Sequence, residues 1–399
     1  MTTTRACAAR LPCPAPHTRH WPAVTTAALT ATVTVMPGFT VGALAPALES
    51  GLGLSRSAIG LALSCFYAAT ALGSPIARRV AARFPVHRVL AAAALSAAAV
   101  MLGASQATGM ISLTVLLLLG GLSNALVQPA VGRLIAARTP AHRRSLAAGV
   151  VGAALAAATF VPGLLVALVL PAHGWRVSLL TAGLVALLVT ALAPLARAPL
   201  EPAGPTRTGG HPRTGRTLLL WSSAAALAAT GNNAVATYFV HLGTDSGLSP
   251  TTAGHLLTAS SVLAIAVRVA AGALTDRAPG RNPTVIAAMM CTGGFGLALI
   301  AAGTPVAFTV GALLAFSAGW GWTGLLLATA LHLVTDQAEY AGHTVQVGIY
   351  TGATIAPFAF GAISGALGFT PTALVAATAA FAGAGAITAG AVHLRRSER

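Results

Sequence analysis

Long apolar runs follow one another along almost the whole chain of 399 residues, punctuated by Gly, Pro and Arg. Hydrophobic residues make up 56% of the chain and charged residues only 8%, whereas a soluble globular protein has roughly 25% charged residues. A transmembrane helix needs about 20 apolar residues, so the chain has room for about a dozen spans. The pattern predicts an all-α polytopic membrane protein and argues against a soluble enzyme, a nucleic-acid-binding protein or a disordered chain.

The runs predict twelve transmembrane helices in two sets of six. The first set covers residues 22–46, 57–77, 88–106, 110–131, 145–170 and 175–196, and the second covers residues 217–240, 252–274, 283–302, 305–331, 344–366 and 370–393. The stretch between the sets is rich in Pro, Gly and Thr, which favours a flexible linker. We therefore expect a tail over 1–21, a six-helix bundle over 22–196, a linker over 197–216, a second six-helix bundle over 217–393 and a tail over 394–399.

All 23 basic residues are arginines, against 7 acidic residues, and they fall mainly in alternate loops. Twenty lie on the side of the N-terminus, Arg56 and Arg176 lie on the other side, and Arg268 lies inside an expected span. Cytoplasmic loops of membrane proteins carry the excess of basic residues. The sequence therefore predicts a protein of the cell membrane with both termini and the linker in the cytoplasm, and no nucleic-acid partner.

The two halves share an internal repeat with an offset of 194 positions. The first-half residues Gly53, Leu54, Ser55, Gly60 and Arg83 match Gly247, Leu248, Ser249, Gly254 and Arg277. Each match has the same place relative to the expected helices. The repeat predicts two similar bundles about an axis along the membrane normal.

The most specific stretch follows the eighth expected span and reads GALTDRAPGR from Gly272 to Arg281. It resembles the loop signature of the major facilitator superfamily, a Gly-x-Leu-x-Asp-Arg run that ends in Gly-Arg. In the equivalent stretch of the first half, Ala82 stands at the acidic position and Pro85 at the glycine position. The resemblance implies the major facilitator fold and a secondary transporter that works by alternating access.

The resemblance also implies a gating loop that pins neighbouring helices at the cytoplasmic face. Its residues here are Gly272, Asp276, Arg277 and Arg281, with Arg83 in the first half. The carboxylate of Asp276 can accept hydrogen bonds from a helix N-terminus or an arginine. The alternative is an ordinary charged loop residue.

Two further stretches resemble particular branches of the superfamily. Trp320-Gly321-Trp322, followed by a span with Gly348, Gly352 and Pro357, is similar to cyanate-permease-like carriers. The spacing from Arg268 to Gly272 is similar to the eighth span of monocarboxylate-type carriers, although Ala264 stands where that branch has an acidic residue.

Polar and aromatic residues inside the expected spans are the candidates for substrate binding. Arg268 can bind a small anion in a bidentate way, or else extend to the cytoplasmic surface and brace the adjacent loop. The other candidates are Asn124, Gln128, Asn232, Asn233, Trp320 and Trp322, with Tyr67 and Tyr350 from flanking spans. The alternative for the amides is hydrogen bonding between helices, and for the aromatic rings it is packing.

None of the seven acidic residues lies in the middle of an expected span. A proton as coupling ion would therefore need His255, a carboxylate at the end of a span such as Glu49 or Asp336, or the substrate itself. Buried carboxylates for hydrolysis are equally missing from the pattern. We expect no catalytic residues.

Two groups of metal-ligating residue types match no strong metal motif. One group is in the N-terminal tail and the other follows the tenth span: Cys7, Cys13, His17 and His20, and His332, Asp336, Glu339 and His343. We expect neither a metal site nor a cofactor.

The sequence thus predicts a secondary transporter that moves a small organic solute, with Arg268 favouring an anion. Its expected partners are that solute, the lipid bilayer and a coupling ion such as a proton, and the chain is expected to be a monomer. A proton-coupled efflux antiporter for drugs or metabolites is the alternative within transport. An integral-membrane enzyme or sensor is the alternative outside it.

Overall fold

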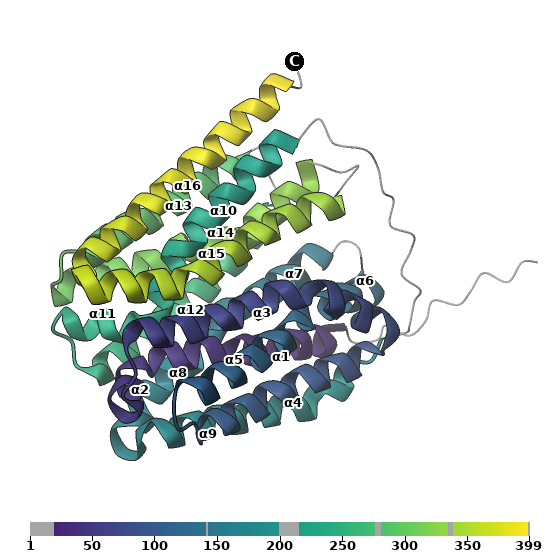
Figure 1. Cartoon of the computed structure of the whole chain (residues 1–399). Helices are drawn as coiled ribbons and strands as arrows, with labels where there is room; N and C mark the ends of the chain where they lie inside the picture. Colours follow the sequence, from purple (N-terminus) through teal and green to yellow (C-terminus); the bar gives the residue numbers. More distant parts are fainter. Residues whose placement is uncertain (1–19, 141–142, 199–214, 276–280, 334–337, 398–399) are drawn as a thin grey trace, which may run out of the picture.

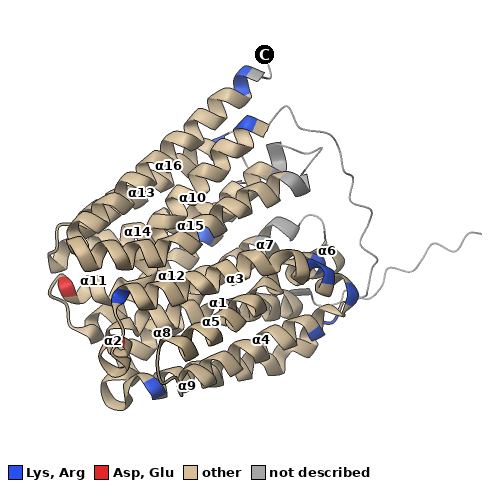
Figure 2. Cartoon of the chain, in the orientation of Figure 1, with Lys and Arg blue, Asp and Glu red and all other residues tan. Residues whose placement is uncertain are grey.

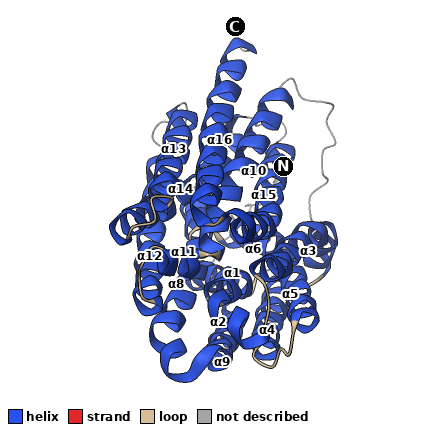
Figure 3. Cartoon of the chain, turned by 60° about the vertical axis from the view of Figure 1, so that its left-hand side comes forward, coloured by secondary structure: helices blue, strands red, loops and turns tan. Residues whose placement is uncertain are grey.

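A computed structural model describes residues 20–140, 143–198, 215–275, 281–333 and 338–397. Every regular element within these ranges is a helix (Figure 3). The first half contains α1(His20–Ala43), α2(Ala45–Leu52), α3(Arg56–Arg83), α4(Val86–Ala104), α5(Met110–Ala125), α6(Val127–Arg138), α7(Arg144–Gly152), α8(Ala154–Leu164), the π-helical turn η2(Leu165–Val169), α9(Leu170–Leu192) and the 3₁₀ turn η3(Ala193–Ala196). The second half contains α10(Gly215–Thr237), α11(Phe239–Asp245), α12(Pro250–Thr275), α13(Asn282–Ile300), α14(Pro305–Leu333), α15(Ala338–Leu367) and α16(Phe369–Ser397).

Each of the twelve predicted runs is helical in the structure, and the all-α membrane fold class is confirmed. Ten segments of the described chain are long and apolar enough to cross a membrane. The count falls short of twelve because residues 149–196 form one apolar segment of 48 residues and because α10 is not among the ten. Within the long segment the chain turns at Gly174, whose φ of 74° is open mainly to glycine.

The helices of each half pack mainly against one another (Figure 1). The halves meet chiefly along two helix pairs, α3 with α15, and α12 with α8 and η2. The turn from α2 to α3 and the turn from α11 to α12 lie at the same end of the molecule, which we call the α2–α11 end. The helix α1 begins, and α16 finishes, at the opposite end.

The internal repeat has a clear structural meaning at the α2–α11 end. Gly53 and Gly247 have φ of 64° and 89° and end the helices before them, as glycine does at helix C-termini. Two residues later, the hydroxyl of Ser55 accepts the backbone N–H of Ala58 at 3.2 Å. Ser249 accepts the N–H of Thr252 at 3.1 Å in the same way. The repeated Gly-Leu-Ser therefore ends one helix and caps the next in both halves.

The same offset of 194 residues relates the two helix pairs between the halves. In the α3–α15 pair, the backbone of Gly60 lies so close to the carbonyl of Pro357 that no side chain fits. In the α12–α8 pair, a Cβ on Gly254 would lie 2.8 Å from the carbonyl oxygen of Gly163. Since Gly60 and Gly254, and likewise Gly163 and Pro357, are 194 positions apart, the two interfaces are pseudo-symmetric.

Large apolar side chains on the outside of the helix groups suit a bilayer rather than water. Leu72, Ile111 and Val306 expose 78%, 82% and 75% of their surface. Figure 2 shows mostly uncharged ribbon along the helices, with the arginines gathered mainly near their ends. The distribution is that of a multi-pass membrane protein.

Candidate functional site

Arg268 lies in the C-terminal part of α12, and its side chain is buried with 7% of the residue exposed. One terminal nitrogen donates to the carbonyl oxygen of Gly152 at 2.8 Å, and the other donates to the carbonyl oxygen of Trp320 at 2.7 Å. Gly152 is the last residue of α7, where the helix breaks before α8. Arg268 therefore connects its own half to the other half of the protein.

An aromatic row leads from Arg268 across the centre of the molecule. The guanidinium carbon of Arg268 lies 5.4 Å from the ring centroid of Trp320, within range of a cation–π interaction. The ring of Trp320 meets Phe39 of α1 edge-on at 5.5 Å, and Phe39 meets Tyr67 of α3 at 6.4 Å. Because Trp320 belongs to the second half and Phe39 to the first, the row crosses the interface between them.

Two polar atoms at the ends of this row lack hydrogen-bond partners within the described part of the chain. They are the Nε of Arg268 and the hydroxyl of Tyr67, and both are buried. A buried donor without a partner costs about 1–3 kcal/mol, so native structures seldom keep one without a reason. The two groups are suited to receive a polar ligand.

Asn232 supports the same region from α10. Its amide nitrogen donates to the carbonyl oxygen of Gly319 at 2.6 Å, next to Trp320. Its neighbour Asn233 donates to Ala229 within its own helix at 2.9 Å. Only the first of these two predicted residues therefore reaches the Trp320 segment.

Trp322 lies apart from the aromatic row although it is only two residues from Trp320. It is fully buried in a core cluster internal to the second half, whereas Trp320 belongs to the cluster shared by both halves. Two residues along a helix differ by about 200° in direction. The structure therefore separates these two candidates.

The remaining candidates lie away from Arg268 or toward the surface. Asn124 of α5 donates to the hydroxyl of Thr70 at 3.3 Å and accepts from Thr34 at 3.3 Å, which ties α1, α3 and α5 together. Gln128 is exposed and Tyr350 is half-buried. The structure thus brings together Arg268, Trp320, Asn232 and Tyr67 among the predicted substrate-binding residues.

The predicted gating loop falls largely outside the described residues. Asp276 and Arg277 lie there, as does Asp336 among the carboxylates considered earlier. Gly272 is part of α12, while Arg281 and Arg83 are exposed. The role of the loop stays a prediction.

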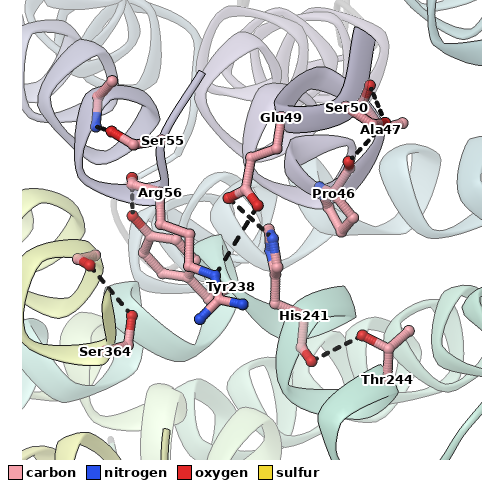
Figure 4. Close-up of polar contacts among 12 residues, drawn as sticks. Pro46, Ala47, Glu49, Ser50, Ser55, Arg56, Tyr238, His241, Thr244 and Ser364 are labelled. Atoms are coloured by element: carbon pink, nitrogen blue, oxygen red, sulfur yellow. Dashed lines mark hydrogen bonds and ion pairs between the residues drawn. The ribbon is translucent and has the colours of Figure 1, made fainter. Parts of the chain in front are cut away.

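A second polar cluster, which the sequence did not single out as a whole, lies at the α2–α11 end (Figure 4). A carboxylate oxygen of Glu49 lies 3.1 Å from the Nε2 of His241, and the other lies 3.9 Å from the Nε of Arg56. The hydroxyl of Tyr238 lies 3.1 Å from the carbonyl oxygen of Arg56 and 2.9 Å from that of Pro357. We call Glu49, Arg56, Tyr238 and His241 the α2–α11 cluster.

Comparisons with known proteins agree with this architecture. A curated gallate transporter of Pseudomonas putida is 32% identical over 166 residues, which are 41% of this chain and 36% of that transporter. The alignment therefore spans little more than a third of that relative's length. The fold is similar to a bacterial homologue of the human lysosomal transporter Spinster, solved in inward-facing conformations. Its unoccupied form has a TM-score of 0.67 at 16% identity over 96% of each chain, and its occupied form has 0.71 at 14% identity over 97% of this chain and 98% of that one.

The fold and the groups around Arg268 together define a helical multi-pass membrane protein. These polar and aromatic groups are buried where the two halves meet. The family model of the Major Facilitator Superfamily matches residues 27–345. The chain belongs to the Major Facilitator Superfamily, as the stretch from Gly272 to Arg281 predicted.

Proposed function

We propose that the protein is a secondary transporter that carries a small aromatic carboxylate by alternating access. The observation that supports this most directly is the buried guanidinium of Arg268, with a free Nε beside the ring of Trp320. A planar guanidinium matches a carboxylate with two parallel hydrogen bonds, and aromatic walls accommodate an aromatic ring. The related gallate transporter is named for an aromatic carboxylate.

The hydrogen bonds of Arg268 limit which contacts a bound anion can replace. The guanidinium now donates to one carbonyl in each half, those of Gly152 and Trp320. A bidentate carboxylate would take the Nε and one terminal nitrogen, so it would compete with one of these carbonyls. The terminal nitrogen on the same edge as the Nε–H is Nη2, which now donates to Trp320. The anion would therefore replace a bond within the second half, while Nη1 keeps its bond to Gly152 across the interface.

We further propose an orientation in the membrane and a coupling ion for the protein. The protein lies in the cell membrane with both termini in the cytoplasm, because twenty arginines lie on the side of the N-terminus and two on the other. It moves its solute as a monomer without covalent chemistry, and a proton is the proposed coupling ion. The loop around Asp276 acts as its cytoplasmic latch.

Solute counterflow with the purified protein in proteoliposomes tests this function. The panel contains aromatic carboxylates, aliphatic carboxylates, neutral aromatic solutes and aromatic amines, each with and without a pH gradient. We expect aromatic carboxylates to exchange fastest. Preference for a cationic or neutral solute would contradict the proposal.

Arg268→Gln tests the role of the guanidinium. Loss of one charge-assisted contact costs about 1.5–3 kcal/mol, so the affinity for the anion should fall about ten- to a hundredfold. Arg268→Lys should restore it only in part, because an ammonium lacks the planar fork. Binding is measured per folded molecule, and the exposed Arg396→Gln is the matched control. Wild-type affinity in Arg268→Gln would show that Arg268 is only structural.

A further inference from the structure

The α2–α11 cluster joins the two halves through charged groups. Glu49 and Arg56 come from α2 and α3 of the first half, and His241 comes from α11 of the second half. Within the described residues, the contacts of Glu49 with these two partners are the only ion-pair contacts. The cluster is therefore a place where the charge of one side chain changes the attraction between the halves.

His241 is the one histidine in this contact. Its side chain is 6% exposed and lies 3.1 Å from the carboxylate of Glu49. Histidine is the side chain that ordinarily gains or loses its charge between about pH 5 and 8. A protonated imidazole forms a charge-assisted contact with a carboxylate, which is roughly twice as strong as one between neutral groups.

Arg56 does not replace His241 as the partner of Glu49. The distance from its Nε to the carboxylate is 3.9 Å, and its side chain is 37% exposed. Exposed ion pairs contribute little to stability. Arg56 is also held from the other side, since its guanidinium carbon lies 4.6 Å from the ring centroid of Phe369.

Aromatic rings and charged groups surround His241. Its ring lies 5.8 Å from the ring of Tyr238 and 6.2 Å from that of Phe369, and aromatic faces attract positive charge. The charged and titratable groups nearby are Glu49, Arg56 and Tyr238, with Asp245 exposed one turn further along α11. On α12, the helix that follows α11, His255 is exposed. Neither the ring nitrogens of His241 nor the facing carboxylate oxygen of Glu49 have a hydrogen-bond partner among the described residues, so the 3.1 Å contact is an ion-pair distance without hydrogen-bond geometry.

We propose that Glu49 and His241 form a proton-binding site that closes the α2–α11 end of the protein. With the proton bound, the imidazolium and the carboxylate hold α2 and α11 together. As the pH rises, the imidazole loses its charge and the contact between the halves weakens.

Proton binding at this site and closure of the α2–α11 end affect each other equally. If the proton stabilises the closed end, closing the end takes up a proton and opening it releases one. The pH of the solvent at the α2–α11 end thereby sets how readily that end opens. This inference is independent of the solute, and it goes beyond the proposed function because it assigns the proton a site.

Distance measurement between spin labels tests the proposal in the full chain in lipid nanodiscs. The four cysteines are replaced by serine, and labels are placed at the exposed Ser50 of α2 and Thr370 of α16. Double electron–electron resonance then follows the ratio of closed to open populations from about pH 5 to 8. We expect this ratio to fall about five- to tenfold over the range, a common size for coupling between two sites.

Three variants decide the result. His241→Gln and Glu49→Gln keep a hydrogen-bonding side chain without the titrating charge, so either one should abolish the pH response. The exposed His255→Gln should keep it. A wild-type protein without pH response, a response that survives in His241→Gln or Glu49→Gln, or a response that disappears in His255→Gln would overturn the proposal.

Discussion

Tyr67 has two parts with different roles: its ring packs, whereas its hydroxyl is available to bind a ligand. It is buried, and no group in the described part of the chain bonds to it. The ring alone would fill the same space, as Phe66 does beside it at 5.1 Å between centroids. A hydroxyl kept without a partner at the end of the aromatic row suits a ligand that arrives during the cycle.

Tyr67→Phe should therefore weaken binding of the transported anion about tenfold, the effect of losing about 1.4 kcal/mol. Its melting temperature should stay the same or rise, because the substitution removes an unsatisfied buried group. Equilibrium binding and thermal unfolding measure the two effects. In Tyr238→Phe, by contrast, a hydroxyl beside two carbonyls is lost, and stability should fall. Unchanged binding in Tyr67→Phe would assign Tyr67 to packing.

Sequence patterns singled out some of the residues that meet around Arg268 more readily than others. Arg268 and Trp320 could be found because a charge and an indole are conspicuous in apolar spans. Helical periodicity alone could have separated Trp322 from Trp320. His241 could not be identified as a partner of Glu49, because the two lie 192 positions apart and no local motif connects them. Their contact depends on how α2 and α11 pack.

The glycines of the two interfaces let helices of opposite halves approach closely. Gly60 lies against the backbone of α15, and Gly254 lies against the backbone of α8 and η2. Both positions belong to the repeat that was visible in the sequence. Their role at the interfaces was not predictable, because it depends on which helix faces each glycine.

Gly60→Ala should force α3 and α15 apart, because the added Cβ would overlap the carbonyl of Pro357. Overpacking of this kind typically costs about 1–3 kcal/mol. We expect a lower melting temperature and slower counterflow, and the same for Gly254→Ala. Gly149→Ala is the matched control, since a Cβ there meets nothing within 4 Å. Equal behaviour of Gly60→Ala and Gly149→Ala would contradict the close contact.

The helix ends show what local signals can and cannot predict. The predicted first span ends at position 46, but the chain continues as α2 to Leu52. Proline is tolerated in the first turn of a helix, so Pro46 lies in the first turn of a new helix that begins at Ala45, after the break at Leu44. The π-helical turn η2 lies in an apolar run, and no pattern in the sequence analysis predicted it.

At the scale of the whole molecule, three kinds of contact hold the halves together. Close glycine contacts run along the two helix pairs, the aromatic row and Arg268 cross the centre, and the α2–α11 cluster joins one end. The first depends only on shape, whereas the other two depend on charge. An anion at Arg268 and a proton at His241 would therefore act on different parts of one interface.

This arrangement gives the two sides of the membrane different roles, so the orientation of the chain matters. In a background without cysteine, Arg207→Cys places a thiol in the linker, and Ser50→Cys places one at the exposed face of α2. The excess of arginine on the linker side predicts that the linker is cytoplasmic. An impermeant maleimide added to intact cells should label position 50 and leave position 207 unlabelled until the membrane is opened. Labelling of position 207 in intact cells would reverse the orientation, and the proton at His241 would then be drawn from the cytoplasm rather than from outside.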